Sequence, residues 1–225
     1  MEFLVALFSI MMVNIVLSGD NAVVIAMASR SLPAKQQKMA ILWGSAGAIG
    51  LRVILTVVAV ALLKIPYLQF AGGVLLVWIA AKLLLEEQHD ETIEASKSFW
   101  GAIKTIIIAD LVMSLDNTLA IAAVANGNYL LLAIGLALSI PLIICGSRLI
   151  MMLMEKFPII VYAGAGLIAW TAGEMMVDDH RLGVFITQLM PEWLLPALIT
   201  AGVLGVGVYV KRQRAKTASR QTAVM

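Results

Sequence analysis

The sequence predicts an all-α membrane protein with seven transmembrane helices, arranged as two inverted-topology three-helix repeats plus one extra C-terminal helix. The first observation is composition: 61% of the 225 residues are hydrophobic and 13% are charged. Soluble domains are nearer to about half apolar and about one quarter charged. The second observation is a series of long apolar segments, and the third is a polar motif that occurs twice within them.

Seven segments meet the requirement of about 20 mostly apolar residues for a helix that crosses the hydrocarbon core of a bilayer. Short stretches with Pro, Gly, Asn or charged residues separate them, as at Lys64-Ile65-Pro66 and Asn126-Gly127-Asn128. We therefore expect one transmembrane domain over residues 1–210 and a basic tail over residues 211–225. The predicted spans cover approximately residues 3–28, 39–63, 67–85, 100–125, 129–154, 158–177 and 192–210.

The distribution of Lys and Arg predicts the orientation of the chain. With seven spans, one side of the membrane receives only Lys64 and Arg181. The other side receives the remaining loop cations, and the positive-inside rule places that side in the cytoplasm. The N-terminus is then expected outside and the C-terminus inside. The cytoplasmic cations are Arg30, Lys35, Lys38, Lys97, Lys156, Lys211, Arg212, Arg214, Lys216 and Arg220.

The repeated polar motif lies in the first and fourth predicted spans. Ser18-Gly19-Asp20-Asn21 recurs as Ser114-Leu115-Asp116-Asn117, an offset of 96 residues (from 20 to 116). A polar residue stands six positions before each Asp: Asn14 in the first copy and Asp110 in the second. Carboxylates inside apolar spans are costly and usually mark ion or proton paths.

The repeat extends beyond this motif. Arg52 and Arg148 occupy equivalent places at the same offset, and Lys82 and Glu174 correspond at an offset of 92 (from 82 to 174). Repeat one covers about 3–85 and repeat two about 100–177, so three spans are followed by three spans. Two such copies cross the membrane in opposite directions, as in many secondary transporters, which bind their substrates near the midplane. The helix at about 192–210 lies outside this symmetry.

When the two motifs are placed together at the pseudo-two-fold axis, their oxygen donors converge. Oxygen-rich sites suit hard divalent cations such as Mg²⁺, Mn²⁺ and Ca²⁺, and neither His89 nor His180 lies in a predicted span. We predict a divalent metal ion as the substrate, with no bound cofactor. The predicted ligands are Asp20, Asn21, Asp116, Asn117, Asp110 and Asn14, with Ser18 and Ser114 nearby.

Other interpretations of these residues remain open. Arg52 and Arg148 either form packing ion pairs with the acids or neutralise an empty site. Met113 is either a thioether ligand that favours Mn²⁺ or a packing residue. Lys82 and Glu174 are secondary candidates for charge balance or gating. The cluster Asp178-Asp179-His180 is either a solvated loop or a weak metal site, and recurring glycines predict close helix packing.

These residues resemble a known family. Ser18-Gly19-Asp20-Asn21-Ala22 and its repeat Ser114-Leu115-Asp116-Asn117-Thr118 are similar to the TerC family of integral membrane proteins, in particular its shorter, YjbE-like branch. The resemblance implies efflux of manganese from a bacterial cell, across its plasma membrane. It also implies that the intramembrane acids bind the ion: Asp20, Asn21, Asp116 and Asn117, and then Asn14 and Asp110.

The leading hypothesis is a secondary exporter of a divalent cation, most readily Mn²⁺, and not an enzyme. The chain has no G-x-x-x-x-G-K-[ST] motif for ATP, and a carboxylate that holds either a metal or a proton suits proton exchange. Three alternatives remain: a non-transporting partner that delivers metal to other membrane or secreted proteins, an exporter of a small cationic metabolite, and an intramembrane aspartyl protease. The composition argues for membrane lipid and against nucleic acid as a partner. The sequence leaves the oligomeric state open.

Overall fold

The computed structural model describes residues 7–8, 11–12, 19–62, 65–85, 95–125 and 129–222, and the described residues form eight helices. Within those helices the side chains of residues 59–62, 95–98, 116–125, 129–132 and 214–222 lie outside the description. The helices are α2 (Gly19–Ser29), α3 (Ala34–Leu62), α4 (Leu68–Leu85), α5 (Ala95–Ala125), α6 (Tyr129–Lys156), α7 (Ile159–Val177), α8 (Leu182–Leu189) and α9 (Leu194–Thr222).

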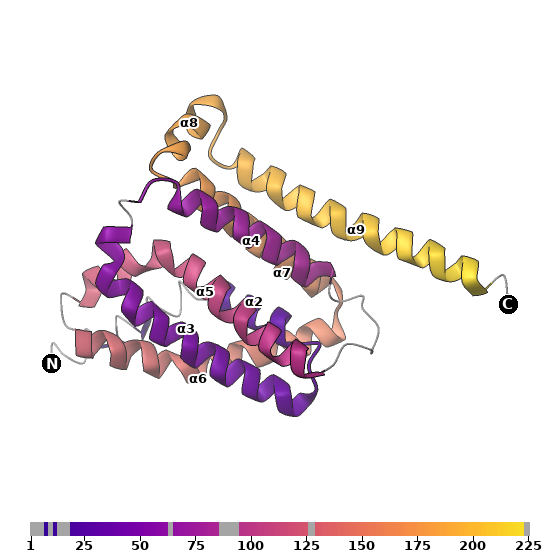
Figure 1. Cartoon of the computed structure of the whole chain (residues 1–225), viewed down its shortest axis with the longest axis horizontal. Coiled ribbons are helices and arrows are strands. Elements are labelled where there is room, and N and C mark those ends of the chain that lie inside the picture. The colour runs from indigo at the N-terminus through magenta and orange to yellow at the C-terminus, as the bar shows by residue number, and fades with distance from the viewer. Residues whose placement is uncertain are drawn as a thin grey trace.

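The helices lie in two groups (Figure 1). One group is α4, α7 and α9, which pack against one another, and the other is α2, α3, α5 and α6. Contacts of α4 with α5 and of α2 with α7 join the two groups. The pattern is balanced: α3 packs on α5 as α2 packs on α6, and α4 meets α5 as α7 meets α2. Exchanging α2 with α5, α3 with α6 and α4 with α7 therefore exchanges the members of each of these pairs of contacts, whereas the contact of α6 with α7 lies outside this correspondence.

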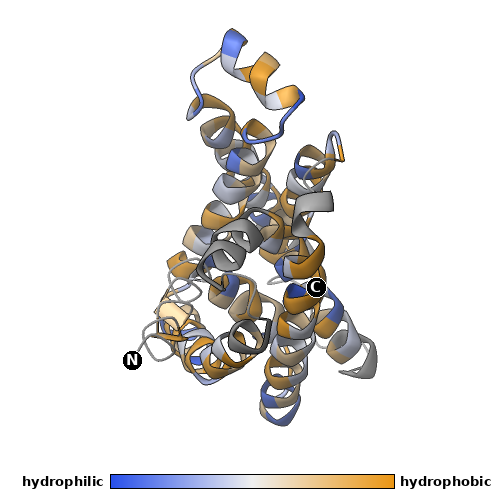
Figure 2. Ribbon diagram, turned by 90° about the vertical axis from the view of Figure 1, so that its left-hand side faces the viewer, coloured by the Kyte–Doolittle hydropathy of each residue, from blue (hydrophilic) through white to orange (hydrophobic). Residues whose placement is uncertain are grey.

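Five of the described helices contain a stretch long and apolar enough to cross a membrane. Hydrophobic residues make up most of the helical ribbon in Figure 2, and large apolar side chains such as Trp43, Trp78 and Ile159 are exposed on the outside. Such surfaces are stable against lipid, so the chain is a multi-pass membrane protein. The five stretches are Ala34–Val58, Leu68–Leu85, Ala133–Lys156, Ile159–Val177 and Leu194–Gln213.

The helix ends differ from the prediction at two places. α5 begins at Ala95, inside the stretch expected to be a charged loop, and α9 continues to Thr222 rather than ending near residue 210. The predicted tail is therefore largely helical, because Lys, Arg, Gln and Ala in that stretch all favour the helix. Part of the predicted first span, including Asn14 and Ser18, lies outside the described residues.

Close contact between α4 and α7 depends on glycine. A methyl group added at Gly73 would lie 2.6 Å from the carbonyl oxygen of Ala172, a backbone atom that cannot move alone. Lipid supplies no hydrophobic force between spans, so helix association relies on such packing. Gly50, Gly202 and Gly205 behave differently, since an added methyl at any of them meets no described atom within 4 Å.

Gly73→Ala is therefore expected to destabilise the protein by about 1–3 kcal/mol, the usual cost of overpacking. Gly202→Ala is the matched control, and we expect it to be neutral or to stabilise α9 by up to about 1 kcal/mol through helix propensity. The free energy of unfolding of detergent-solubilised protein, measured by SDS titration, checks both. Equal effects of the two substitutions would contradict the packing argument.

Asp179 joins three helices on one side of the molecule. Its side chain is 3% exposed, and its carboxylate accepts hydrogen bonds from the backbone N–H groups of Arg181 and Leu182 at 3.0 and 2.9 Å and of Phe70 at 3.2 Å. Burial raises the pKa of Asp179, but the three N–H donors outweigh it and hold the pKa below its ordinary value. The carboxylate thus fixes the start of α8 to α4, which is a structural role.

Asp179→Ala is expected to cost about 1–2 kcal/mol of stability, as for other lost helix caps. Because the folded pKa is lowered, the stabilisation by the carboxylate is complete above the unfolded value of 3.8 and disappears as the pH falls through the folded value. The Asp179→Asn variant has no carboxylate to titrate at this position. The unfolding temperatures of the natural protein and of Asp179→Asn should differ at pH 7 and converge below pH 3.8. A difference that persists in acid would contradict the assignment. Asp178→Asn, at the exposed neighbouring acid, is the control.

Candidate ion-binding site

A buried ion pair joins α3 to α5. Arg52 is 1% exposed and lies within the membrane-crossing stretch of α3. Its Nη2 lies 2.6 Å from Asp110 Oδ1, and its Nε donates to Ser114 Oγ at 2.7 Å. Ser114 Oγ also donates to Asp110 Oδ2 at 3.2 Å. Asp110 and Ser114 are four residues apart on α5, which places them on one face of that helix toward α3.

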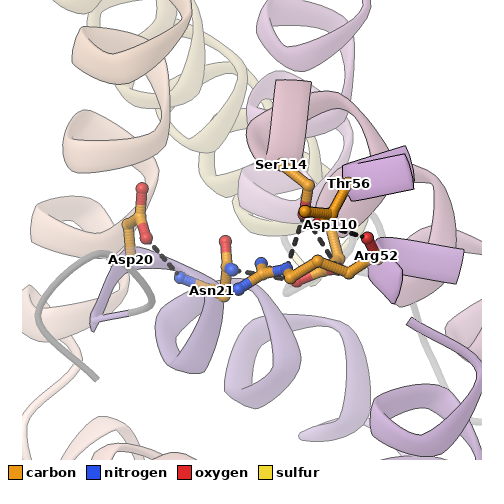
Figure 3. Close-up of polar contacts among 6 residues, drawn as sticks. All are labelled: Asp20, Asn21, Arg52, Thr56, Asp110 and Ser114. Carbon is orange, nitrogen blue, oxygen red and sulfur yellow. Dashed lines mark hydrogen bonds and ion pairs between the residues drawn. The ribbon is translucent and has the colours of Figure 1, made fainter. Parts of the chain in front are cut away.

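Asn21 connects α2 to this ion pair (Figure 3). Its side-chain Nδ2 donates to Asp110 Oδ1 at 2.9 Å, so one carboxylate oxygen accepts from both Arg52 and Asn21. The Asn21 side chain is 3% exposed, and its Oδ1 has no hydrogen-bond partner among the described residues. A buried acceptor without a partner is unfavourable, and such a group in a native protein calls for an explanation, such as strain or a bound water or ion.

Asp20 lies beside Asn21 at the start of α2. Its Oδ1 accepts the backbone N–H of Asn21 at 2.8 Å, and its carboxylate is only partly buried. Arg52 and Asp110 both act on it electrostatically. In Figure 3 the carbonyl oxygen of Asn21 points away from Arg52, and Asp20 lies on the far side of Asn21 from Arg52. Two consecutive residues at the start of α2 thus each carry a side-chain oxygen near the network.

Four other predicted residues occupy core or surface positions. Met113 is buried in the main hydrophobic core, which agrees with its interpretation as a packing residue. Arg148, the repeat equivalent of Arg52, is exposed rather than buried. Glu174 is also exposed, and the Lys82 ammonium lies 5.4 Å from the centre of the Trp78 ring near the end of α4. The roles predicted for these four residues in charge balance, gating or metal binding stay predictions.

Part of the predicted ligand set lies outside the description. Asn14 and Ser18 are not among the described residues, and for Asp116 and Asn117 the structure gives the backbone of α5 but not the side chains. Among the residues whose side chains it describes, no group of three or more His, Cys, Asp and Glu residues is placed to hold a metal ion. The metal-ligand roles accordingly stay predictions.

Thr56 is a site residue that the sequence reading missed. Its Oγ1 donates to the backbone carbonyl of Arg52 at 2.8 Å, one turn earlier on α3. The position of Thr56, four residues after an Arg within a span, could have predicted this contact, because a Thr hydroxyl in a helix commonly donates to the carbonyl one turn before it. This bond keeps the Thr56 hydroxyl satisfied within the span.

Together these features define a class of protein: a multi-pass helical membrane protein with a buried charged and amide network between its helices. Comparison with known proteins gives the particular family. The model of the integral membrane protein TerC family matches residues 1–215, and the chain belongs to that family, as the doubled Asp-Asn motif indicated.

Relatives in two bacteria support the assignment. The chain is 47% identical to the membrane protein YjbE of Bacillus subtilis over 212 residues, 94% of this chain and 97% of YjbE. It is 29% identical to the membrane protein YceF of the same organism, over 67% of this chain and 62% of YceF. It is 25% identical to the inner membrane protein YgdQ of Escherichia coli, over 68% and 72% of the two chains. No solved structure matches significantly.

Proposed function

We propose that this protein is a secondary exporter of a divalent metal cation, most readily Mn²⁺, in a bacterial cell membrane. The observation that carries the proposal is the buried Oδ1 of Asn21, which has no hydrogen-bond partner among the described residues and belongs to the residue that directly follows Asp20. The Asn21 carbonyl oxygen and the Asp20 carboxylate are hard oxygen donors, which is the ligand type that Mg²⁺, Ca²⁺ and Mn²⁺ prefer. The choice of Mn²⁺ among these ions rests on the family resemblance.

The proposed architecture is seven spans in two inverted repeats, 3–85 and 100–177, with a seventh span near 192–210. Two observations support it. The polar motif and its flanking residues recur at a fixed offset in the sequence. The contacts of α3 and of α4 with α5 correspond to those of α6 and of α7 with α2 when α2, α3 and α4 are exchanged with α5, α6 and α7. The site would then lie where the motif helices α2 and α5 pack together, and Asp116 and Asn117 would complete it from α5.

Proton exchange is the proposed driving force. A carboxylate releases a metal ion when it takes up a proton, so one acid alternates between two substrates. The distribution of Lys and Arg supports an N-terminus outside and a C-terminus in the cytoplasm, and export then moves the metal from the side of the basic tail to the opposite side. Transport rather than catalysis is proposed, because the Asn after each Asp suits a ligand shell.

The test is metal flux into liposomes that contain only the purified protein. We expect Mn²⁺ uptake that is faster when the liposome lumen is acidic, because protons then leave as Mn²⁺ enters. An uncoupler should abolish this acceleration. Liposomes without protein and liposomes with the Asp20→Asn variant are the controls. Absence of flux for Mn²⁺, Mg²⁺ and Ca²⁺ alike would overturn the proposal and would favour a non-transporting partner.

A further inference from the structure

The chemistry of the Asn21–Asp110 contact fixes the direction of the Asn21 carboxamide. A carboxylate in contact with Arg52 only accepts hydrogen bonds, so the group 2.9 Å from Asp110 Oδ1 has to be the amide nitrogen of Asn21. The carbonyl oxygen of Asn21 is then turned to the opposite side. That side is where the structure leaves the oxygen without a partner among the described residues.

Asp110 itself is already engaged by donors. Its Oδ1 accepts from Arg52 and from Asn21, and its Oδ2 accepts from Ser114. The guanidinium of Arg52, 1% exposed, stays fixed through a second hydrogen bond to Ser114. A metal ion that bound Asp110 would have to approach this fixed positive charge and displace a charge-assisted hydrogen bond, which is among the stronger kinds. Asp110 is therefore poorly suited to be a ligand, although the sequence predicted it as one.

We propose that Asp110 is a positioning residue: held by Arg52 and Ser114, it turns the carbonyl oxygen of Asn21 toward a divalent cation that Asp20 binds. This inference rests on the proposed function. It assigns the anionic ligand on α2 to Asp20 and the neutral ligand to Asn21. The Arg52–Asp110 pair contributes no net charge, and it acts on the ion only through Asn21, as outer-shell partners of metal ligands commonly do.

Calorimetric Mn²⁺ affinity of the purified protein in nanodiscs tests the roles with three variants. Asp110→Ala removes the acceptor for Asn21 and should weaken binding about 10- to 100-fold. The double variant Arg52→Gln with Asp110→Asn keeps an oxygen acceptor for Asn21, a donor on α3 and zero net charge. Its affinity should therefore stay within about threefold of the natural protein, a smaller loss than that expected for Asp110→Ala. Asp20→Asn should abolish measurable binding.

The outcomes distinguish a failure of the positioning role of Asp110 from a failure of the proposed function. If the double variant Arg52→Gln with Asp110→Asn (the neutral pair) binds Mn²⁺ as poorly as Asp20→Asn does, Asp110 is a ligand and the positioning role is wrong. If the natural protein binds no Mn²⁺, Mg²⁺ or Ca²⁺, the proposed function itself fails. Should the neutral pair not fold, pulsed electron–nuclear double resonance of bound Mn²⁺ in protein with ¹³C-labelled Asp carboxylates decides. The full set of carboxylate couplings should be unchanged in Asp110→Asn, and the loss of any one of them in that variant would overturn the inference.

Discussion

Replacing Asp20 with Asn is expected to abolish Mn²⁺ export, with a loss of about 100-fold or more in transport rate at low Mn²⁺. Loss of an outer-shell partner alone typically costs about 10- to 100-fold in metal affinity, and Asp20 is proposed as a direct anionic ligand. Asparagine has nearly the same shape and retains an oxygen for the backbone N–H of Asn21, so the substitution removes the charge and little else. Protection of cells from excess Mn²⁺, at matched expression, measures the effect.

The repeat supplies a second expectation for the same experiment. Asp116→Asn changes the equivalent residue of the second motif and should reduce export to a similar degree. Asp178→Asn is the matched control, because it neutralises an exposed Asp that follows the end of α7, and it should leave export intact. Full protection by both the Asp20→Asn and the Asp116→Asn variants would show that the ion is bound elsewhere.

Replacing Arg52 with Leu is expected to produce the largest loss of stability, about 3–5 kcal/mol. The substitution removes the cation but leaves Asp110, which is 12% exposed, as a buried carboxylate without its counter-ion. Breaking one member of a buried ion pair typically costs that much, because the remaining charge is uncompensated. It also removes the hydrogen bond that Arg52 Nε donates to Ser114 Oγ. The free energy of unfolding by SDS titration measures the loss.

Two controls identify the cause. Arg148→Leu changes the repeat-equivalent but exposed arginine and should cost less than about 1 kcal/mol, the upper range for exposed charges. The double variant Arg52→Leu with Asp110→Leu removes both charges, and it should recover much of the stability that the single variant loses. If the double variant is as unstable as Arg52→Leu alone, the loss arises from packing around the guanidinium rather than from the unpaired carboxylate.

The asymmetry between the two repeats illustrates how far a pattern reaches. The sequence shows that Asn14 stands where Asp110 stands in the second copy. That difference makes an ion pair with an arginine available at only one of the two positions. The structure then shows Arg52 buried against Asp110 and Arg148 exposed. The pairing of Arg52 with Asp110, rather than with Asp20 or Asp116, depends on which helix faces meet, and no spacing in the sequence states that.

Asp179 shows the same limit from another direction. Read as sequence, Asp178-Asp179-His180 is an acidic loop that either binds metal weakly or is solvated. The two carboxylates differ only after folding: Asp178 is exposed, whereas Asp179 accepts three backbone N–H groups, one of them from Phe70 more than one hundred residues earlier. Local spacing indicates a helix cap, but the contribution of α4 is a long-range contact.

The membrane class, the helical segments and the doubled polar motif could all be predicted from the sequence, and through that motif the family could be predicted too. These features are periodic or compositional, and each follows from the cost of exposing backbone or charge to lipid. Which polar groups meet is known only from the fold: Asp110 is joined to Arg52 and Asn21, and the Oδ1 of Asn21 has no hydrogen-bond partner among the described residues. Hydrogen-bond partners on different helices depend on helix rotation and packing, which are set by the whole assembly of side chains rather than by any one segment.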